Sequence, residues 1–502
     1  MAVSCRYLLA IITVAGGASF QFYTLGVINP PQQVMEEWVN ATYASRGNGV
    51  GFSDTTLTLF WSFVSASTGI GCLIGCLLTK PVSENFGRRN GLIANGVVNV
   101  FGAVLEAISK SAQSPELLIF GRLILGVNLG LATSLAPMYI TEISPVKYRG
   151  AAGTAHQVAS AFGDWLSLFL GLPAILGGRN LWPLACGFVG IPAFLMVLAL
   201  PWLPKSPRFL MIARGEKEKA RDAMEKLLGR ENLQQSFETL EKEALECKTL
   251  LKPVNPLLDL FRLRHLRIPM LICIVCMVAR QSTGVVAVFL YSTDIFIQAD
   301  LSPQSAQLAT LACGISYFLC VLPSIYLIEK WGRRALALLL LIGCGLCLSV
   351  LTAFIALRDY CNLRWASYAC IVVLMVYMCV YGIGSPVPWL ITSELFGQQY
   401  RSAAVTVSML VTWGLHTLIS IGYLPLQQVV GPVLSMVPFI VTLILTTAVL
   451  MAFLPETRNR SIDDIVSQFK GTKSQSMEKL QLLEDGRKLV QRKPGYGAVQ
   501  LF

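Results

Sequence analysis

The feature of this sequence that most constrains its fold is an internal duplication. The tripeptide Gly-Arg-Arg at residues 87–89 returns at residues 332–334, 245 positions later (332 minus 87). An acid followed seven residues later by a base also occurs twice, as Glu142 with Arg149 and as Glu394 with Arg401. A chain of two related halves, each rich in apolar segments, is typical of transporters that move two repeats about a central site.

The apolar segments are long enough to cross a membrane. Hydrophobic residues make up 54% of the chain and charged residues 14%, whereas soluble proteins carry about 25% charged residues. A helix of about 20 apolar residues crosses the ~30 Å hydrocarbon layer. The first apolar run is too long for a signal-peptide core and reads as a span. The sequence therefore predicts an all-α membrane protein with twelve transmembrane helices, near residues 8–28, 56–79, 91–109, 117–138, 151–173, 182–203, 268–293, 306–328, 335–357, 366–392, 402–424 and 431–454.

The basic residues indicate how the chain is oriented. Those in alternate short links gather on one side, which the positive-inside rule makes cytoplasmic: Lys80, Arg88, Arg89, Lys147, Arg149, Lys330, Arg333, Arg334 and Arg401. This distribution explains the net charge of +11 without any nucleic-acid partner. An even number of spans leaves both termini in the cytoplasm. We expect a multi-pass protein of the cell (plasma) membrane that functions as a monomer in the lipid bilayer.

The same pattern divides the chain into four parts. Residues 1–203 and 268–466 form the two six-helix halves, and residues 204–267 form a cytoplasmic linker. Within the linker, residues 216–221 and 237–243 interleave opposite charges at helical spacing, which predicts amphipathic helices. Residues 467–502 are polar with no core pattern, which predicts a disordered cytoplasmic tail.

No pattern indicates an enzyme, a cofactor or a metal site. The sequence has no P-loop, no zinc spacing and no nucleophile elbow where a soluble catalytic domain would hold one. Most of the fourteen cysteines lie inside apolar runs, where they are expected to pack as small residues. Asn40-Ala41-Thr42 lies in the long first loop, on the predicted outer side, and Asn40 is therefore a candidate glycosylation site.

At a series of motifs the chain resembles the facilitative hexose transporter family, in the sugar-porter branch of the major facilitator superfamily. The resemblance extends from about Gln21 to Phe469. Besides the duplicated motifs, it includes Gly26-Val27-Ile28-Asn29, Gly121-Arg122-Leu123, Pro137-Met138-Tyr139, Gly153-Thr154-Ala155-His156-Gln157, Pro207-Arg208-Phe209-Leu210, Pro386-Val387-Pro388-Trp389 and Pro455-Glu456-Thr457. It implies the major facilitator fold, with two pseudo-symmetric six-helix halves.

The resemblance assigns the duplicated charges to a cytoplasmic gate. It implies that the charges pair across helix ends when that side is closed and separate when it opens, and ion pairs at a partly wet boundary are weak enough to break in each cycle. The gate residues are Arg88, Arg89, Glu142, Arg149, Arg333, Arg334, Glu394 and Arg401. One residue departs from the family pattern: Lys205 stands where the family usually has an acid, whereas the second half keeps Glu456. We expect Lys205 to weaken the gate of the first half.

The resemblance also points to a sugar site between the halves. Hexose hydroxyls both donate and accept hydrogen bonds, so a binding cavity needs neutral amides and aromatic faces. Gln157 and Gln281 match family glutamines that contact sugar, Trp389 matches a tryptophan platform, and Trp413 and His416 lie one turn apart. The candidate substrate-binding residues are Gln157, Gln281, Arg280, Tyr317, Trp389, Trp413 and His416. Arg280, Tyr317 and His416 replace amides of the family pattern, so selectivity is expected to differ from that of a dedicated glucose carrier.

Three charges fall deep inside predicted spans, where an unpaired charge costs about 3 kcal/mol on insertion scales. Asp164 lies seven residues after Gln157 and so shares its helix face, and Arg280 is central in its span. We consider both a mutually neutralising pair and two separate water-facing charges. Arg122 matches an arginine that proton-coupled relatives pair with an acid on the first span, but residues 21–26 contain no acid.

These observations predict facilitative, alternating-access transport of a hexose such as glucose or fructose. Two alternatives stay open. A proton-coupled sugar or polyol symporter would use Asp164 as its proton carrier. A transport-inactive sugar sensor or receptor would explain the altered cavity and the basic tail.

Overall fold

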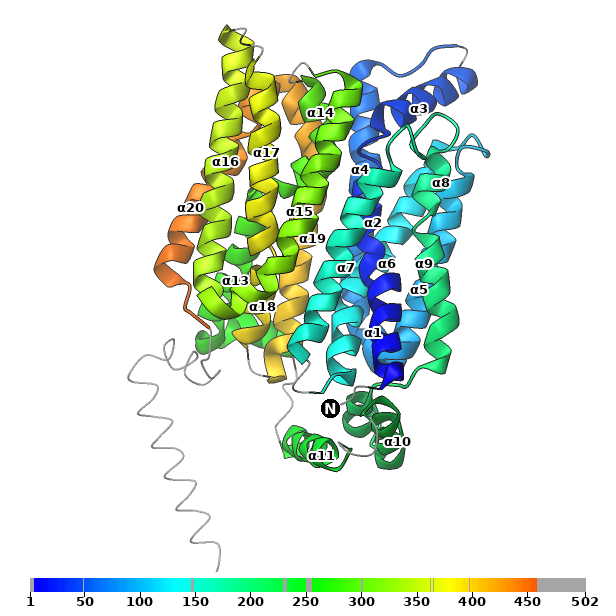
Figure 1. Cartoon of the computed structure of the whole chain (residues 1–502), viewed down its shortest axis with the longest axis vertical. Helices are drawn as coiled ribbons and strands as arrows, with labels where there is room; N and C mark the ends of the chain where they lie inside the picture. Colours follow the sequence, from blue (N-terminus) through cyan, green and yellow to red (C-terminus); the bar gives the residue numbers. More distant parts are fainter. Residues whose placement is uncertain are drawn as a thin grey trace, which may run out of the picture.

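The structure is a computed structural model that describes residues 4–47, 49–145, 149–228, 233–249, 255–298, 301–361, 363, 365–396 and 398–457. Every regular element in these residues is a helix. Figure 1 shows two bundles of roughly parallel helices side by side, with α3 (Gln32–Arg46) at one end and α10 (Lys217–Leu228) and α11 (Leu233–Thr249) at the other. We call these the outer end and the inner end. The predicted disordered tail, residues 467–502, lies outside the described residues.

The first half contains six membrane-crossing segments. The first is interrupted, because α1 (Cys5–Gly17) and α2 (Tyr23–Gly26) are joined by the 3-10 turn η1 (Ser19–Phe22). The others are α4 (Asp54–Asn85), α5 (Gly87–Ile108), α6 (Pro115–Ile143), α7 (Arg149–Leu170), and α8 (Trp182–Gly187) continued by α9 (Gly190–Ala199) and the turn η3 (Leu200–Trp202). The predicted span at residues 8–28 is therefore not one continuous helix.

The second half repeats this order. It comprises α13 (Arg264–Ser282) with α14 (Val285–Gln298), then α15 (Pro303–Trp331), α16 (Arg333–Cys361), α17 (Trp365–Gly384) with α18 (Val387–Glu394), α19 (Gln398–Ser435) and α20 (Val437–Phe453). The break between α13 and α14 falls at Gly284, which has a φ of 81°, a value that glycine adopts without strain. The break before α18 falls at Pro386, whose ring cannot donate a backbone hydrogen bond inside a helix.

Between the halves, a short π-helical turn (Phe209–Ala213), α10 and α11 pack on one another through a small apolar cluster of their own. The amphipathic helices predicted in the linker are thus present. They lie beneath the bundles at the inner end, followed by α12 (Pro256–Arg262).

Ten helices within the described residues are long and apolar enough to cross a membrane. The two further predicted spans correspond to α7, whose polar residues lower its hydropathy, and to the shorter α20. The last span begins at Val437 rather than near residue 431, because α19 continues past a kink at Gly431, which has a φ of 83°.

Close packing of small residues holds the first half together. A Cβ atom added to Gly71 of α4 would lie 2.1 Å from the carbonyl oxygen of Leu123, and one added to Gly126 of α6 would lie 2.1 Å from that of Thr68. The backbones of α4 and α6 therefore touch. Helix association in lipid depends on such van der Waals contact, because hydrocarbon removes most of the hydrophobic driving force.

Candidate transport site and gates

At the outer end, hydrogen bonds join the two halves. Asn29, in the turn after α2, donates through Nδ2 to the carbonyl oxygen of Phe289 at 2.7 Å and to Ser292 Oγ at 2.8 Å. Its Oδ1 accepts the backbone N–H of Thr293 at 3.3 Å. The Asn29 side chain, from the first half, thus forms hydrogen bonds with three groups of α14 in the second half. The structure is closed at this end.

A small pocket lies beside this contact and is lined from both halves by Asn29, Gln32, Gln33, Thr293, Asp294 and Gln307 among others. Glu36 of α3 accepts a hydrogen bond from Gln32 Nε2 at 2.9 Å. Burial raises the pKa of Glu36 to about 7, and the nearby carboxylate of Asp294 adds to the rise, while the Gln32 bond opposes it. Carboxyl groups from opposite halves therefore approach one another at the closed outer end.

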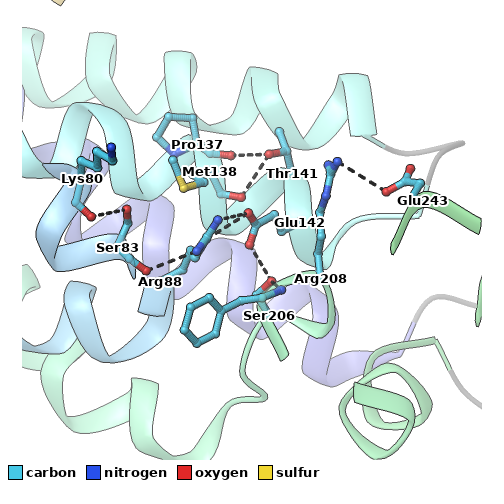
Figure 2. Close-up of polar contacts among 11 residues, drawn as sticks. Lys80, Ser83, Arg88, Pro137, Met138, Thr141, Glu142, Ser206, Arg208 and Glu243 are labelled. Carbon is cyan, nitrogen blue, oxygen red and sulfur yellow. Dashed lines mark hydrogen bonds and ion pairs between the residues drawn. The ribbon is translucent and has the colours of Figure 1, made fainter. Parts of the chain in front are cut away.

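At the inner end, the charged contacts of the first half surround Glu142 at the end of α6 (Figure 2). Arg88 donates from Nε to Glu142 Oε1 at 3.0 Å, and Ser206 Oγ donates to Glu142 Oε2 at 2.5 Å. Arg88 also donates to the Ser83 carbonyl oxygen and lies over the Phe209 ring. Arg208 points away from this group and pairs with Glu243 of α11 at 3.5 Å, which ties the linker to the bundle.

The second half repeats the arrangement around Glu394. Arg333 donates to Glu394 Oε1 at 3.0 Å, and Thr457 Oγ1 donates to Glu394 Oε2 at 2.5 Å. Glu456 adds a contact with the start of α16, because its two oxygens accept the backbone N–H groups of Arg333 at 2.9 Å and Arg334 at 3.0 Å. A carboxylate at a helix N-terminus satisfies donors that the helix itself leaves free.

Among the described residues of the first half, no carboxylate makes the corresponding contact with α5. Helix α5, the counterpart of α16, starts without a side-chain cap, and exposed Lys205 occupies the position that corresponds to Glu456. The two halves therefore differ chemically at this position, with a lysine in the first half and a glutamate in the second. The sequence predicts that difference from Lys205, but the lost contact is a cap on α5 rather than a partner for the arginine cluster.

The structure shows which members of the predicted gate contact one another among the described residues. Each acid contacts an arginine from a different link, Glu142 with Arg88 and Glu394 with Arg333. Arg401 donates to the Phe396 carbonyl oxygen at 3.4 Å. The side chain of Arg149 is outside the described part of the chain. Arg89 and Arg334 donate to carbonyl oxygens of Leu203 and Met451, each at 2.7 Å and within its own half.

Several predicted sugar-binding residues converge near the centre of the second half. Arg280 lies over the Trp389 ring, with its guanidinium carbon 5.1 Å from the centroid, and also near Tyr381 at 5.8 Å. Tyr317 packs against Tyr381 at 5.8 Å between centroids. Gln281 donates through Nε2 to the Thr412 carbonyl oxygen at 2.7 Å. The Arg280 guanidinium thus covers one face of the Trp389 ring, the ring that the sequence predicts as a platform for sugar.

Trp413 and His416 lie at the boundary between the halves. Their rings meet edge to face at 5.3 Å, as their spacing on α19 predicts. Trp413 packs against Cys72 and Leu129 of the first half. Within the described residues, four buried polar atoms of this region have no hydrogen-bond partner: Arg280 Nε, Gln281 Oε1, Trp413 Nε1 and His416 Nε2. Buried polar atoms that lack hydrogen-bond partners, close to where several polar and aromatic side chains meet, are the groups to which a polar ligand would bind.

From the first half, α7 contributes Gln157 and Asp164. Gln157 is half-buried, whereas Asp164 is only 6% exposed. Asp164 lies within electrostatic range of Arg280 across the boundary between the halves. No ion pair closer than 4.0 Å joins the two among the described contacts, so the direct neutralising contact that we considered is not formed in this conformation.

Arg122 has a counter-ion that sequence reasoning missed. Glu106 of α5 places Oε1 3.9 Å from Arg122 Nη1, and both side chains are fully buried. Arg122 also donates to the carbonyl oxygens of Val64 at 3.0 Å and Thr24 at 3.3 Å. An acid inside a span is the only sequence signal for this contact, since the chain position of Glu106 does not indicate which helix it faces.

At the outer end, Asn40 accepts the backbone N–H of Phe52 through Oδ1 at 2.7 Å and is partly exposed on α3. Its helix, α3, lies at the end of the molecule opposite to α10 and α11 (Figure 1). Glycosylation at Asn40 stays a prediction.

Comparison with known proteins agrees with this architecture. A family model described as "Sugar (and other) transporter" matches residues 9–469. The chain is 37% identical over 468 residues to solute carrier family 2, facilitated glucose transporter member 3, of Homo sapiens, with 92% of each chain covered. It is 36% identical over 480 residues to facilitated glucose transporter member 1 of Gallus gallus, covering 94% of this chain and 96% of that protein.

Solved structures share the fold. The xylose transporter XylE of E. coli, in a partially occluded inward-open conformation, superposes with a TM-score of 0.73 at 21% identity, covering 91% of this chain and 100% of that one. A structure of the proton:xylose symporter XylE with 6-bromo-6-deoxy-D-glucose gives the same TM-score at 22% identity, with 92% and 99% covered. The predicted twelve-helix major facilitator fold is thereby confirmed.

Proposed function

Because this chain belongs to the sugar transporter family, we propose that it carries a hexose such as glucose or fructose passively across the membrane by alternating access. The named relatives are facilitated glucose transporters. The chain is a multi-pass membrane protein of that family, and transport of a small sugar accounts for its two-half architecture without any catalytic group.

The observation that best supports alternating access is the difference between the two ends. At the outer end, Asn29 of the first half is hydrogen-bonded to α14 of the second. At the inner end, Glu142 and Glu394 each bind an arginine of their own half. Contacts between halves at one end and within halves at the other are expected of a carrier whose inner end is free to separate.

The proposed sugar site lies between these ends. Gln157 and Asp164 face it from α7, and Gln281, Arg280, Tyr317, Trp389, Trp413 and His416 line the second half. Amide and indole groups there exchange hydrogen bonds with sugar hydroxyls, while the aromatic faces cover the apolar face of the ring. The four buried polar atoms without partners give a bound hydroxylated ligand a free-energy advantage over an apolar one.

The test is counterflow of labelled glucose, fructose and galactose in proteoliposomes that contain the purified protein. Wild-type protein should accelerate exchange of at least one hexose above protein-free vesicles. Gln281→Leu and Trp389→Leu should reduce it at least about tenfold, because each removes a direct ligand contact. The matched control is Gln234→Leu, an exposed residue of the linker helix α11 whose side chain hydrogen-bonds Glu238 of the same helix. Equal rates in wild-type and empty vesicles would refute transport, and sugar binding without counterflow would identify a sensor.

A second candidate is proton-coupled symport. Two intramembrane acids favour it, Asp164 near the boundary between the halves and Glu106 beside Arg122. Collapse of accumulated sugar on dissipating the pH gradient would establish this coupling. Unchanged counterflow without a pH gradient, and no accumulation against a sugar gradient with one, would support the passive carrier.

The remaining assignments are proposals of the same kind. We propose a plasma-membrane protein with both termini cytoplasmic, which functions as a monomer without cofactor, metal or nucleic acid. The halves comprise residues 1–203 and 268–466, joined by the linker at 204–267. Epitope tags on intact and permeabilised cells test the orientation: a terminal tag accessible without permeabilisation would contradict it.

A further inference from the structure

One face of α4, in the first half, packs against α19 of the second half. Near the outer end, Thr58 Oγ1 of α4 accepts a hydrogen bond from Gln428 Nε2 of α19. About half-way along α4, a Cβ atom added to Gly69 would lie 2.4 Å from Thr417 Oγ1 of α19. We call the stretch between these two contacts the α4–α19 seam. Because the two helices belong to different halves, the seam has to separate when the outer end opens.

Two serines of α4 lie in this seam. Ser62 and Ser65 follow Thr58 by four and seven residues and precede Gly69 by seven and four, and this spacing places all four residues on one face of the helix. Both serines are buried, with exposed fractions of 0% and 1%. Neither hydroxyl has a hydrogen-bond partner among the described residues. The seam therefore buries two polar groups from the first half without satisfying them.

Other hydroxyl groups of α4 behave differently. Four of them donate to a carbonyl oxygen three or four residues earlier in the helix, which is common for serine and threonine in membrane helices: Thr58, Ser67, Thr79 and Ser83. Thr68 also lacks a partner in the described part of the chain. It precedes Gly71 and Gly75 by three and seven residues, however, and so belongs to the face that packs on α6. Ser62 and Ser65 are thus distinguished by their place in the seam.

Two hydroxyls on the opposite side of the seam already have partners. Tyr291 of α14 lies near Ser65, but its hydroxyl donates to the Ser420 carbonyl oxygen at 3.0 Å. Ser420 of α19 donates through its own hydroxyl to the His416 carbonyl oxygen at 2.8 Å. No described group comes within hydrogen-bond distance of Ser65 Oγ. The closed conformation therefore satisfies these groups of the second half and leaves the two serines of the first half unbonded.

Burying a hydroxyl without a partner costs free energy, because its hydrogen bonds to water are lost and not replaced. The closed seam imposes this cost at Ser62 and at Ser65. When the halves separate at the outer end, water or the hydroxyls of an entering sugar can bond to both groups. Asn29 acts in the opposite direction, because its three hydrogen bonds to α14 join the halves only while the outer end is closed.

We infer that Ser62 and Ser65 oppose closure of the outer end and, together with the opposing contacts of Asn29, set the balance between the outward-open and the outward-closed carrier. The two serines regain hydrogen bonds only in the open state, so they favour the conformation that receives sugar from outside. This inference rests on the proposed alternating access. It goes further because it assigns the conformational balance to two side chains outside the gates and outside the candidate sugar-binding residues.

Ser62→Ala and Ser65→Ala test the inference, since alanine removes the hydroxyl and keeps a good helix former. Each variant should favour the closed outer end. In hydrogen–deuterium exchange followed by mass spectrometry, amides of α14 should therefore exchange at least about fivefold more slowly than in wild type. Ser67→Ala is the matched control. Ser67 is as deeply buried, with an exposed fraction of 1%, but it donates to the Val64 carbonyl oxygen at 2.7 Å, so its removal should not slow α14 exchange.

A double variant separates a shifted balance from a general change in stability. Asn29→Ala favours the open outer end and Ser62→Ala favours the closed one. Amides of α14 in Asn29→Ala/Ser62→Ala should therefore exchange at least about fivefold more slowly than in Asn29→Ala alone. Amides of α16 should keep their wild-type rates in every variant, because α16 is not part of the contact between the halves that we describe at the outer end.

Unchanged or faster α14 exchange in either serine variant would overturn the inference. Slowing by Ser67→Ala as large as that by Ser62→Ala would overturn it too, because the hydrogen-bonded serine would then act like the unbonded ones. The exchange measurement needs no sugar and is therefore independent of the transport assay. A wild-type protein without counterflow would refute the proposed hexose transport, whereas slower α14 exchange in the two serine variants would still support the inference.

Discussion

Replacing Asn29 with alanine should release the outer end of the carrier. Asn29 makes three hydrogen bonds to α14, at 2.7, 2.8 and 3.3 Å. All three cross from one half to the other, so they must break when the outer end opens. In the open state, water can bind the same groups, and each bond therefore stabilises the closed conformation by its net rather than its gross energy.

The size of the effect follows from that count. A hydrogen bond contributes about 0.5–1.5 kcal/mol net, and the long third bond contributes least. Asn29→Ala should thus disfavour the closed conformation by about 2–3 kcal/mol, which raises the ratio of outward-open to outward-closed protein roughly 30- to 150-fold, given 1.4 kcal/mol per factor of ten. Gln307→Ala removes a single bond of 3.4 Å to the Pro30 carbonyl oxygen, and should change the ratio less than about threefold.

Hydrogen–deuterium exchange followed by mass spectrometry measures this ratio, because local opening exposes the backbone of the outer end. In Asn29→Ala, amides of α14 should exchange at least about tenfold faster than in wild type, while those of α16 keep their rates. Asn40→Ala is the control, since its hydrogen bond to Phe52 stays within one half. Exchange of α14 in Asn29→Ala that matches Gln307→Ala would show that Asn29 does not hold the outer end closed.

Three further results are expected. Glu456→Ala should lower the free energy of unfolding by about 1–2 kcal/mol because it uncaps α16, and Lys205→Glu should raise it by a similar amount because it caps α5. Thermal unfolding of the purified protein tests both variants. If Lys205→Ala stabilised the protein as much as Lys205→Glu, the capping explanation would be excluded. The pKa of Glu36 rises from an ordinary 4.5 to about 7 in the closed structure. The closed state therefore binds the Glu36 proton more tightly, so lowering the pH from above 7 towards 4.5 should favour the closed outer end and slow amide exchange in α14. If Glu36→Gln kept the same pH dependence of exchange, another group would be responsible for it. Asn40→Gln should abolish a glycosidase-sensitive shift in electrophoretic mobility, and a shift that persists would place the glycan at another residue.

Much of the fold is predictable from this sequence because membrane spans are specified locally. An apolar run either reaches the length of the hydrocarbon layer or does not, and backbone groups in lipid must bond within their own helix. The breaks at Gly284, inside the predicted span 268–293, and at Pro386, before Val387, also depend on the backbone chemistry of single residues. The start of the last span shows the limit of this reasoning: we expected it near residue 431, but α19 continues through a kink at Gly431 as far as Ser435.

The candidate site is less predictable, because its contacts depend on how helices rotate and pack. The sequence places Glu142 in a gate with several arginines but does not indicate which of them it binds, and in the structure it contacts Arg88 from another link. Glu106 and Arg122 are sixteen residues apart (122 minus 106) on neighbouring helices, and only the packing of α5 on α6 brings them within 3.9 Å. Likewise, Ser206 and Thr457 carry no charge pattern that would mark them as partners of gate acids.

The sequence by itself determined the duplication, the spans, the polar residues placed inside them and the departure at Lys205, because each depends on residue type and spacing along one chain. Only the tertiary structure decided which end is closed, which arginine each acid binds, and that Glu106 is the counter-ion of Arg122. These relations join residues up to 264 positions apart. Their free energy depends on distance and burial, which are set when the helices pack together.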